Sequence, residues 1–233
     1  MFKSIKLGVV ALLLAACTAP GSRHATPQNP GESPAAPPLH GRVYRIDESR
    51  SELRILVYRA GPLAHLGHNH VMVNRSIHGV VNLADSVAET QFSMEVPVAA
   101  FVVDDAQARS EEGEDFPGDV PDDAKSGTWN NMTGPAVLNS VRYPVISMRS
   151  VRLEELQGTP TATVAVSVAG HESTVTVPFI LKKEVYGLSA MASFELRQTA
   201  VGITPFSLML GALAVRDAMQ VKLKVIAQLE APR

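Results

Sequence analysis

Three histidines lie within six consecutive positions in the first third of the chain: His65, His68 and His70. Neutral imidazole binds Zn²⁺, and histidine also exchanges protons near neutral pH. If this segment is a strand, His68 and His70 point to the same side, because side chains alternate along a strand. A zinc site needs at least three protein ligands, so His65, or the more distant His78 or His171, would have to complete it.

The sequence contains no local motif of the kind that accompanies catalysis by histidine. The chain contains no phosphate-binding glycine loop, no dinucleotide-binding glycine pattern, no nucleophile elbow and no Cys-x-x-Cys pair. A Ser/His/Asp triad assembled from distant segments would leave no such motif. The letters HNH at residues 68–70 do not indicate a nuclease, because that label names a dispersed metal-binding unit. We therefore expect no enzymatic activity and no cofactor.

Charge and composition exclude further classes of function. The formal net charge of the 233 residues is -2, and aromatic residues make up only 5%. A nucleic-acid-binding protein would usually carry a basic face or a platform of stacking aromatics. We therefore expect no nucleic-acid partner. With 45% hydrophobic and 19% charged residues, the chain has the composition of an ordinary globular protein.

From residue 42 onward, the dominant pattern is alternation with a period of two, which is typical of half-buried antiparallel strands. Turn-forming residues separate the alternating segments, and no βα alternation appears. A closed barrel would remove the exposed edges of so many strands. We therefore predict an all-β, antiparallel barrel of about eight strands, whose interior is filled by side chains or holds one ligand. The alternating apolar positions include Leu53, Ile55, Val57, Phe92, Met94, Val164, Val166, Val168, Val175, Val177, Phe179, Leu181, Met219, Val221, Leu223 and Val225.

One central segment interrupts this pattern. Residues 104–123 contain nine acidic residues and one arginine. We interpret them as a solvated loop, because the spacing of an EF-hand calcium loop is absent. A helix is expected to follow, with Asp122 or Asp123 in its first turn, as part of a helical insertion near residues 121–140.

The N-terminal segment has the features of an export signal. Lys3 and Lys6 precede an apolar run at residues 7–16, which is too short to span a bilayer. The Leu-Ala-Ala-Cys sequence that ends at Cys17 resembles the lipobox of bacterial lipoproteins; a plain secretory signal is the alternative. We expect a signal peptide at residues 1–16, a lipidated Cys17 that begins a proline-rich tether at residues 17–40, and a folded domain at residues 41–233. The protein would then lie on the periplasmic side of the envelope, anchored in a membrane, with the outer membrane favoured.

Several longer motifs resemble one family of exported bacterial proteins. They are YRIDESRSELRILVYRAG (residues 44–61), LGHNHVMVNRSIHGVVNL (66–83, with Gly79 at the family's glycine), YPVISMRS (143–150), VAGHESTVTVPF (168–179) and AVGITPF (200–206). Together they are similar to the YceI-like family. This resemblance implies a lipocalin-like barrel that binds a polyisoprenoid or a similar long apolar chain. One departure follows Val103, where the family's Arg-Asp pair is replaced and Arg109 is expected to lack its aspartate.

The function that we expect is binding of an apolar lipid-like or isoprenoid ligand inside the barrel. The simplest interpretation of the histidines is that they are polar residues at the barrel mouth, where they could also hold the polar end of the ligand. A metal-binding envelope protein that uses His65, His68 and His70 is the main alternative, and a filled barrel that serves as an interaction module is another. The sequence does not indicate an oligomeric state. The candidate ligand-binding residues are His65, His68, His70, Phe92, Met94, Trp129 and Phe206.

Overall fold

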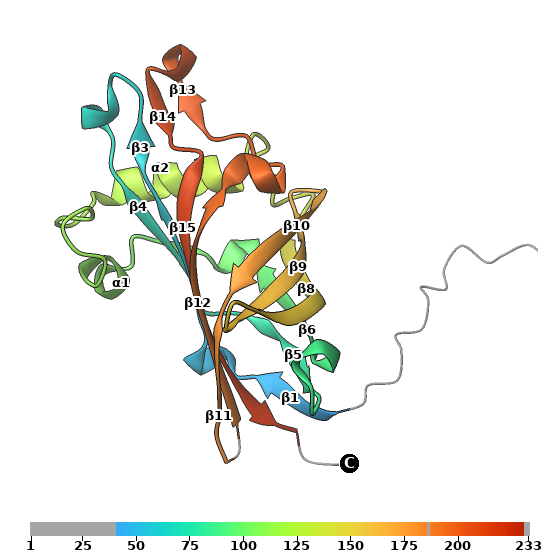
Figure 1. The fold of residues 1–233 in the computed structure, drawn as a ribbon. Coiled ribbons are helices and arrows are strands. Elements are labelled where there is room, and N and C mark those ends of the chain that lie inside the picture. The colour runs from blue at the N-terminus through green and yellow to red at the C-terminus, as the bar shows by residue number, and fades with distance from the viewer. Residues whose placement is uncertain (1–40, 186, 231–233) are drawn as a thin grey trace, which may run out of the picture. The chain divides into compact units, whose positions relative to one another are not determined.

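The structure is a computed structural model that describes residues 41–185 and 187–230. The expected signal peptide, the lipidation site at Cys17 and the proline-rich tether lie outside the described residues. The described part is built mainly from antiparallel strands with short helices between them (Figure 1). None of the helices in this part is both long and apolar enough to cross a membrane.

Twelve strands form the main sheet, and three short strands form a second sheet. The main sheet contains β1 (Arg42–Ile46), β2 (Glu52–Val57), β4 (His70–Asn74), β5 (His78–Leu83), β6 (Gln91–Pro97), β7 (Val102–Val103), β8 (Val145–Leu156), β9 (Thr159–Val168), β10 (His171–Pro178), β11 (Ile180–Lys183), β12 (Gly187–Arg197) and β15 (Ala218–Leu229). The second sheet contains β3 (Arg59–Ala60), β13 (Ser207–Leu208) and β14 (Leu213–Val215).

The long strand β15 is the centre of the main sheet. One edge of β15 pairs with β12 along nearly its whole length, from Arg197 opposite Ala218 to Gly187 opposite Gln228. Its other edge is shared by β1 and β2, which pair with the two halves of the strand. From β1 the sheet continues through β5, β6, β8, β9 and β10, and from β2 it continues through β4 to β7. The sheet therefore branches at β15.

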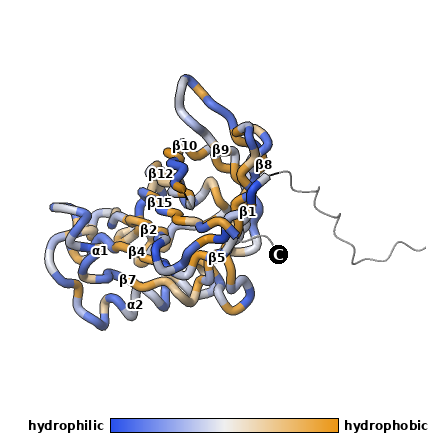
Figure 2. The backbone as a smooth tube through the Cα atoms, turned by 90° about the horizontal axis from the view of Figure 1, so that it is seen from below, coloured by the Kyte–Doolittle hydropathy of each residue, from blue (hydrophilic) through white to orange (hydrophobic). Residues whose placement is uncertain are grey.

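The sheet also curls, so that the β8–β10 end returns toward β12 (Figure 2). Val175 of β10 packs in the same apolar cluster as Leu196 of β12. In the described part of the chain, no hydrogen-bonded ladder joins these two strands. The prediction of an all-β antiparallel fold is confirmed. The expected number of about eight strands is wrong, because short strands such as β1 and β2 share one long partner.

Glycine permits one close contact between neighbouring strands. Gly79 of β5 belongs to the second residue pair between β5 and β6. Its φ of +152° is unfavourable for residues other than glycine. A Cβ atom at this position would lie 2.2 Å from the carbonyl oxygen of Ser93. The absence of a side chain is therefore required for β5 and β6 to pair here.

Two α-helices cover different parts of the sheet. Helix α1 (Ala106–Ser110) lies within the acidic segment that we expected to be a solvated loop. Part of that expectation is wrong, because Phe116 is buried against Val71 and Val73 of β4, in an apolar cluster outside the main core. Helix α2 (Asp122–Thr133) begins where the sequence predicted it, with Asp122 in its first turn. The unexpected burial arises because β4 has apolar side chains on both faces, and its outer face needs a cover.

Six short 3₁₀ turns connect the strands of the described chain. Two of them, η2 and η6, lie beside the second sheet at the top of Figure 1, far from the C-terminal end of β15. The turns are η1 (Glu48–Arg50), η2 (Ala64–Leu66), η3 (Val87–Glu89), η4 (Val98–Ala100), η5 (Gln198–Val201) and η6 (Met209–Gly211).

Candidate functional site

A cavity of about 440 Å³ lies inside the curled main sheet. Its volume is within the range of small-molecule sites in proteins. The inward-facing side chains of at least six strands line it, and almost all of them are apolar. They include Leu53, Ile55 and Val57 of β2, Phe92 and Met94 of β6, Val164, Val166 and Val168 of β9, Val175 and Val177 of β10, Ala190, Ala192 and Phe194 of β12, and Val221, Leu223 and Val225 of β15.

Polar side chains gather at one end of this cavity, near α2 and the second sheet. Arg59, His68, His70, Thr128 and Asn131 line the cavity there. No aspartate or glutamate of the described residues is part of the lining. The wall therefore offers hydrogen-bond donors, a guanidinium and a hydroxyl at this end, and it is almost entirely hydrocarbon elsewhere, where Thr90 and Gln198 are the polar exceptions. We call this set of five residues the polar end of the cavity.

His70 is the most firmly held residue of the polar end. Its Nδ1 lies 2.6 Å from Oδ2 of Asp104, and its Nε2 lies 3.2 Å from the hydroxyl oxygen of Thr128. The Asp104 side chain is completely buried, and its other oxygen accepts hydrogen bonds from the backbone N–H of Val71 and from Nη1 of Arg109. Both Asp104 and Arg109 are thus satisfied although they are buried, as buried charges must be.

The environment of Asp104 favours its ionised form. Burial alone would raise the pKa of this carboxyl group. The hydrogen bonds from His70 and from the Val71 backbone, together with the charges of His70 and Arg109, outweigh burial and lower the pKa below its ordinary value. Asp104 is therefore a carboxylate near neutral pH, and it fixes the orientation of the His70 ring.

Arg109 is held in turn by the loop around it. Its guanidinium donates to the carbonyl oxygens of Asn69, Pro117 and Gly118, and it lies over the ring of Phe116. Helix α1 places this arginine. Asp105 caps the helix by accepting from the backbone N–H of Ala108, and this hydrogen bond lowers the pKa of Asp105.

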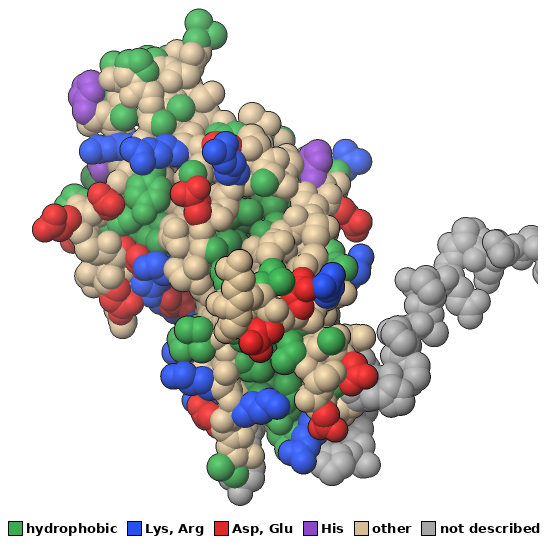
Figure 3. Space-filling model, in the orientation of Figure 1, with side chains coloured by type: hydrophobic (Ala, Val, Ile, Leu, Met, Phe, Trp, Pro, Cys, Tyr) green, Lys and Arg blue, Asp and Glu red, His purple; other side chains and the backbone are tan. Residues whose placement is uncertain are grey.

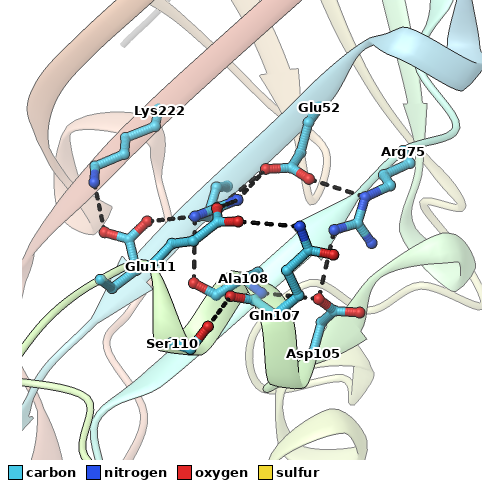
Figure 4. Close-up of polar contacts among 10 residues, drawn as sticks. Glu52, Arg75, Asp105, Gln107, Ala108, Ser110, Glu111 and Lys222 are labelled. Carbon is cyan, nitrogen blue, oxygen red and sulfur yellow. Dashed lines mark hydrogen bonds and ion pairs between the residues drawn. The ribbon is translucent and has the colours of Figure 1, made fainter.

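A network of ion pairs fixes α1 to the outer face of the sheet (Figure 4). Arg54 of β2 donates to Glu52, Glu111 and Glu112, at distances between 2.6 and 3.0 Å. Glu112 is nearly fully buried and also pairs with Lys222 of β15. The network connects β2 and β15 with the end of α1, so it contributes to the placement of Arg109.

Asp104, His70 and Thr128 form a row of carboxylate, imidazole and hydroxyl groups. The catalytic triad of acyl-transfer enzymes has the same order of groups. Such enzymes additionally aim free backbone N–H groups at the oxyanion that forms. Thr128 lies in the middle of α2, where backbone N–H groups are used within the helix. The backbone of α2 around Thr128 therefore supplies no free N–H group for such an oxyanion.

The structure brings five of the seven predicted binding residues to one cavity. His68, His70, Phe92, Met94 and Phe206 line it, and the rings of His68 and His70 are 6.0 Å apart. His68 precedes β4 instead of lying on it, because the strand begins at His70.

The other two predicted residues are not part of the cavity wall. His65 is exposed on η2, and Trp129 lies on α2, beside Thr128, and is also exposed. On a helix, neighbouring residues face about 100° apart, so only one of Thr128 and Trp129 can point at the cavity. His65 and Trp129 are therefore not brought into the cavity wall with the other five, and a role for them in ligand binding stays a prediction.

The geometry does not assemble the three-histidine metal site that the sequence left open. Within residues 41–185 and 187–230, no group of three or more His, Cys, Asp or Glu side chains is placed to hold a metal ion. His78 pairs with Glu48, and His171 packs against Gly202. Neither therefore completes a site with His68 and His70.

Comparison with known proteins identifies the family. A family model described as a YceI-like domain matches residues 44–227, which is most of the chain. The chain belongs to the YceI-like family. Proteins of this family are generally binding proteins rather than enzymes. No curated protein matches this YceI-like chain.

Solved structures share the fold at low sequence identity. BcnA from Burkholderia cenocepacia has a TM-score of 0.59 and 15% identity, and the match covers 78% of this chain and 99% of that one. A polyisoprenoid binding domain from Saccharophagus degradans, described as implicated in plant cell wall breakdown, has a TM-score of 0.52 and 6% identity, over 80% and 98% of the two chains. At these identities the likeness concerns the fold alone.

In this YceI-like chain, sequence reasoning missed Asp104 and Thr128 and misjudged Arg109. We expected Arg109 to lack an aspartate, but Asp104, five residues earlier, pairs with it at 2.8 Å. The available signal was an acidic residue directly after the apolar segment Phe101–Val103, where a carboxylate next to a buried strand needs a partner. Thr128 had no comparable signal, because the side of α2 that faces the cavity depends on how the helix packs.

Proposed function

We propose that this protein binds one long-chain apolar molecule, isoprenoid or lipid-like, in its cavity and does not alter it chemically. The observation that carries the proposal is the lining of the cavity, which is almost entirely apolar along the strands and gathers most of its polar side chains at one end. Transfer of hydrocarbon from water into such a wall is favourable by about 0.8 kcal/mol per buried CH₂ group. A ligand with a hydrocarbon chain and one polar end matches this distribution.

The comparisons support the same class of ligand. The chain is a member of the YceI-like family, and one structural neighbour is described as a polyisoprenoid binding domain. In this proposal the curled sheet serves as a lipocalin-like container, and the ligand occupies the space between the β8–β10 end and β12. The free edge between β10 and β12 gives the container room to adapt to chains of different width.

The polar end would hold the ligand's head group. His70 and Thr128 have fixed positions, and His68 and Arg59 add further donors. Because no carboxylate of the described chain lines this end, a head group with acceptor oxygens is favoured over a cationic one.

The N-terminal sequence has the pattern of an export signal, which supports a location outside the cytoplasm for this binding activity. Lys3, Lys6, the apolar run and Cys17 have the arrangement of a lipoprotein signal. We propose that the mature protein is anchored through Cys17 on the periplasmic side of the envelope, by the outer membrane. Acylation of Cys17 is tested by mass spectrometry of the N-terminal peptide, with Cys17→Ala as the control; an unacylated peptide from the wild type would contradict it.

The decisive test of binding is organic extraction of the full chain purified from its native membrane, followed by mass spectrometry. We expect one long-chain apolar molecule per chain. The variant Thr128→Val, which removes a hydroxyl but keeps the shape, and the double variant His68→Ala/His70→Ala should retain less of it. His78→Ala, whose histidine lies outside the cavity, is the matched control. A wild-type protein with no extractable lipid would refute the proposal, and equal occupancy in all variants would refute the role of the polar end.

A further inference from the structure

Four large apolar side chains are exposed together beside the second sheet. Leu210 is fully exposed, Met209 is 73% exposed, Leu66 is 64% exposed and Leu208 is 48% exposed. They lie on η2, β13 and η6, and we call these four residues the apolar tip. The space-filling view shows hydrophobic side chains at the top of the molecule, where these turns project (Figure 3). Exposure of this kind is unusual for turns, which are generally polar, and needs an explanation.

The backbone holds the apolar tip in a defined shape. The N–H of Leu63 donates to the carbonyl oxygen of Ala212, at 2.8 Å, and joins the two turns. Gly61 lies so close that a Cβ atom there would be 2.5 Å from the carbonyl oxygens of Gly211 and Ala212. The two turns are therefore packed against each other and project as one unit.

The turn that carries Met209 and Leu210 is strained. Their φ angles are +50° and +56°, in the left-handed region that large side chains rarely adopt. Gly211 follows with a φ of +89°. Strain of this kind persists where the surrounding structure enforces it, and it gathers at sites of function. Here the strained residues are the two most exposed apolar side chains of the tip.

The apolar tip is continuous with the mouth of the cavity. Leu208 belongs to both, and it pairs across the second sheet with Leu213, which also lines the cavity. On the other turn, Leu66 is followed directly by Gly67 and His68, which line the cavity as well. A surface that covers the tip would therefore also cover the entrance at the polar end.

The two segments that carry the apolar tip contain charged side chains of one sign only. Residues 58–70 and 202–216, which form the second sheet and its turns, contain no aspartate or glutamate. They contain Arg59 and Arg216, and Arg216 is held over the ring of Tyr58 at 5.7 Å. Apolar side chains that project beyond a base of arginines are the arrangement that binds an anionic lipid surface.

We propose that the apolar tip inserts into the surface of an anionic phospholipid bilayer and sets the mouth of the cavity against the membrane. A second copy of the chain is a poorer candidate than a bilayer for binding the apolar tip, for two reasons. The tip is convex and small, whereas a stable protein interface buries roughly 1,000 Å² or more. Two copies that met tip to tip would also bring Arg59 and Arg216 of each into like-charge contact. Docking is independent of whether the cavity holds a ligand.

The depth of the tip can be measured with tryptophan fluorescence. The full chain carries Leu210→Trp together with Trp129→Phe, so that the only tryptophan is at the tip. We expect vesicles of phosphatidylcholine and phosphatidylglycerol with brominated acyl chains to quench it. Attachment at the N-terminus cannot produce this signal. The matched control, Val141→Trp with Trp129→Phe, places the tryptophan at an exposed valine outside the tip and should not be quenched. Equal quenching at both positions, or at neither, would overturn the proposal.

The affinity of the protein for these vesicles provides a second test of the docking proposal. In the Cys17→Ala background, which has no acyl anchor, Met209→Ser/Leu210→Ser should weaken binding to these vesicles by at least about tenfold, because two large apolar side chains no longer enter the bilayer. Val141→Ser/Val185→Ser removes similarly exposed side chains elsewhere and should bind as the wild type does. Unchanged affinity of the tip variant, or a dimer in sedimentation equilibrium that this variant abolishes, would overturn docking. Lipid extraction from the same tip variant reports on the cavity separately, so failure of docking and failure of ligand binding are distinguishable.

Discussion

Nδ1 of His70 lies 2.6 Å from Oδ2 of Asp104, and the Asp104 side chain has no contact with solvent. The two residues are 34 positions apart and meet because β4 pairs with β7, with Met72 opposite Val103. The pair connects the cavity to the outer layer of the protein, since Asp104 also pairs with Arg109 of α1. The orientation of a cavity residue thus depends on a buried ion pair outside the cavity.

The lowered pKa of Asp104 predicts how stability depends on pH. A carboxylate whose pKa is lower in the folded than in the unfolded state stabilises the fold fully above its unfolded value of about 3.9. This contribution is lost as the pH falls through the folded value. Asp104→Asn should therefore cost about 3 kcal/mol at pH 7, where Arg109 loses its partner, and progressively less below pH 4. Urea unfolding at pH 7, 5 and 3.5 measures this.

A second aspartate serves as the control for this experiment. Asp85 is exposed in the turn that follows β5, and Asp85→Asn should leave the free energy of unfolding within about 0.5 kcal/mol of the wild type at each pH. A constant cost of Asp104→Asn from pH 7 to pH 3.5 would show that the charge of Asp104 does not contribute to stability.

The ion pairs of Arg54 predict a contrast between two arginines on the sheet. Arg54→Met should cost about 3 kcal/mol, because it leaves the nearly buried Glu112 with Lys222 as its remaining partner. Arg45→Met is the matched control: Arg45 is exposed and, among the residues that the structure describes, its one ion pair is with Glu230, so its loss should cost less than about 1 kcal/mol. Chemical unfolding gives both values. If the two substitutions cost the same, the network does not fix α1 to the sheet.

Alternation within strands made much of the cavity wall predictable. Val164, Val166 and Val168 were expected to share one face of a strand, and all three line the cavity. Period two is a local property of the backbone, so the sequence is sufficient to group these side chains. The same reasoning grouped Met219, Val221, Leu223 and Val225, and these also line the cavity.

The choice of partners could not be predicted in the same way. β15 pairs with β12 on one edge and with both β1 and β2 on the other, and this branching depends on contacts between distant segments. His70 and Asp104 met for the same reason. The burial of Phe116 was missed because its neighbours in the sequence are acidic, although the outer face of β4 needs an apolar cover.

Filling the cavity tests whether its empty space is the binding site. Ala190 of β12 lines the cavity, and Ala190→Phe would project a ring into the 440 Å³ space. We expect lipid extraction to show that bound ligand is lost. The free energy of unfolding should stay within about 1 kcal/mol of the wild type, because the ring enters free space instead of a packed core. Ser193→Phe, on the outward face of the same strand, is the control and should keep its ligand. Full occupancy in Ala190→Phe would place the ligand outside this cavity.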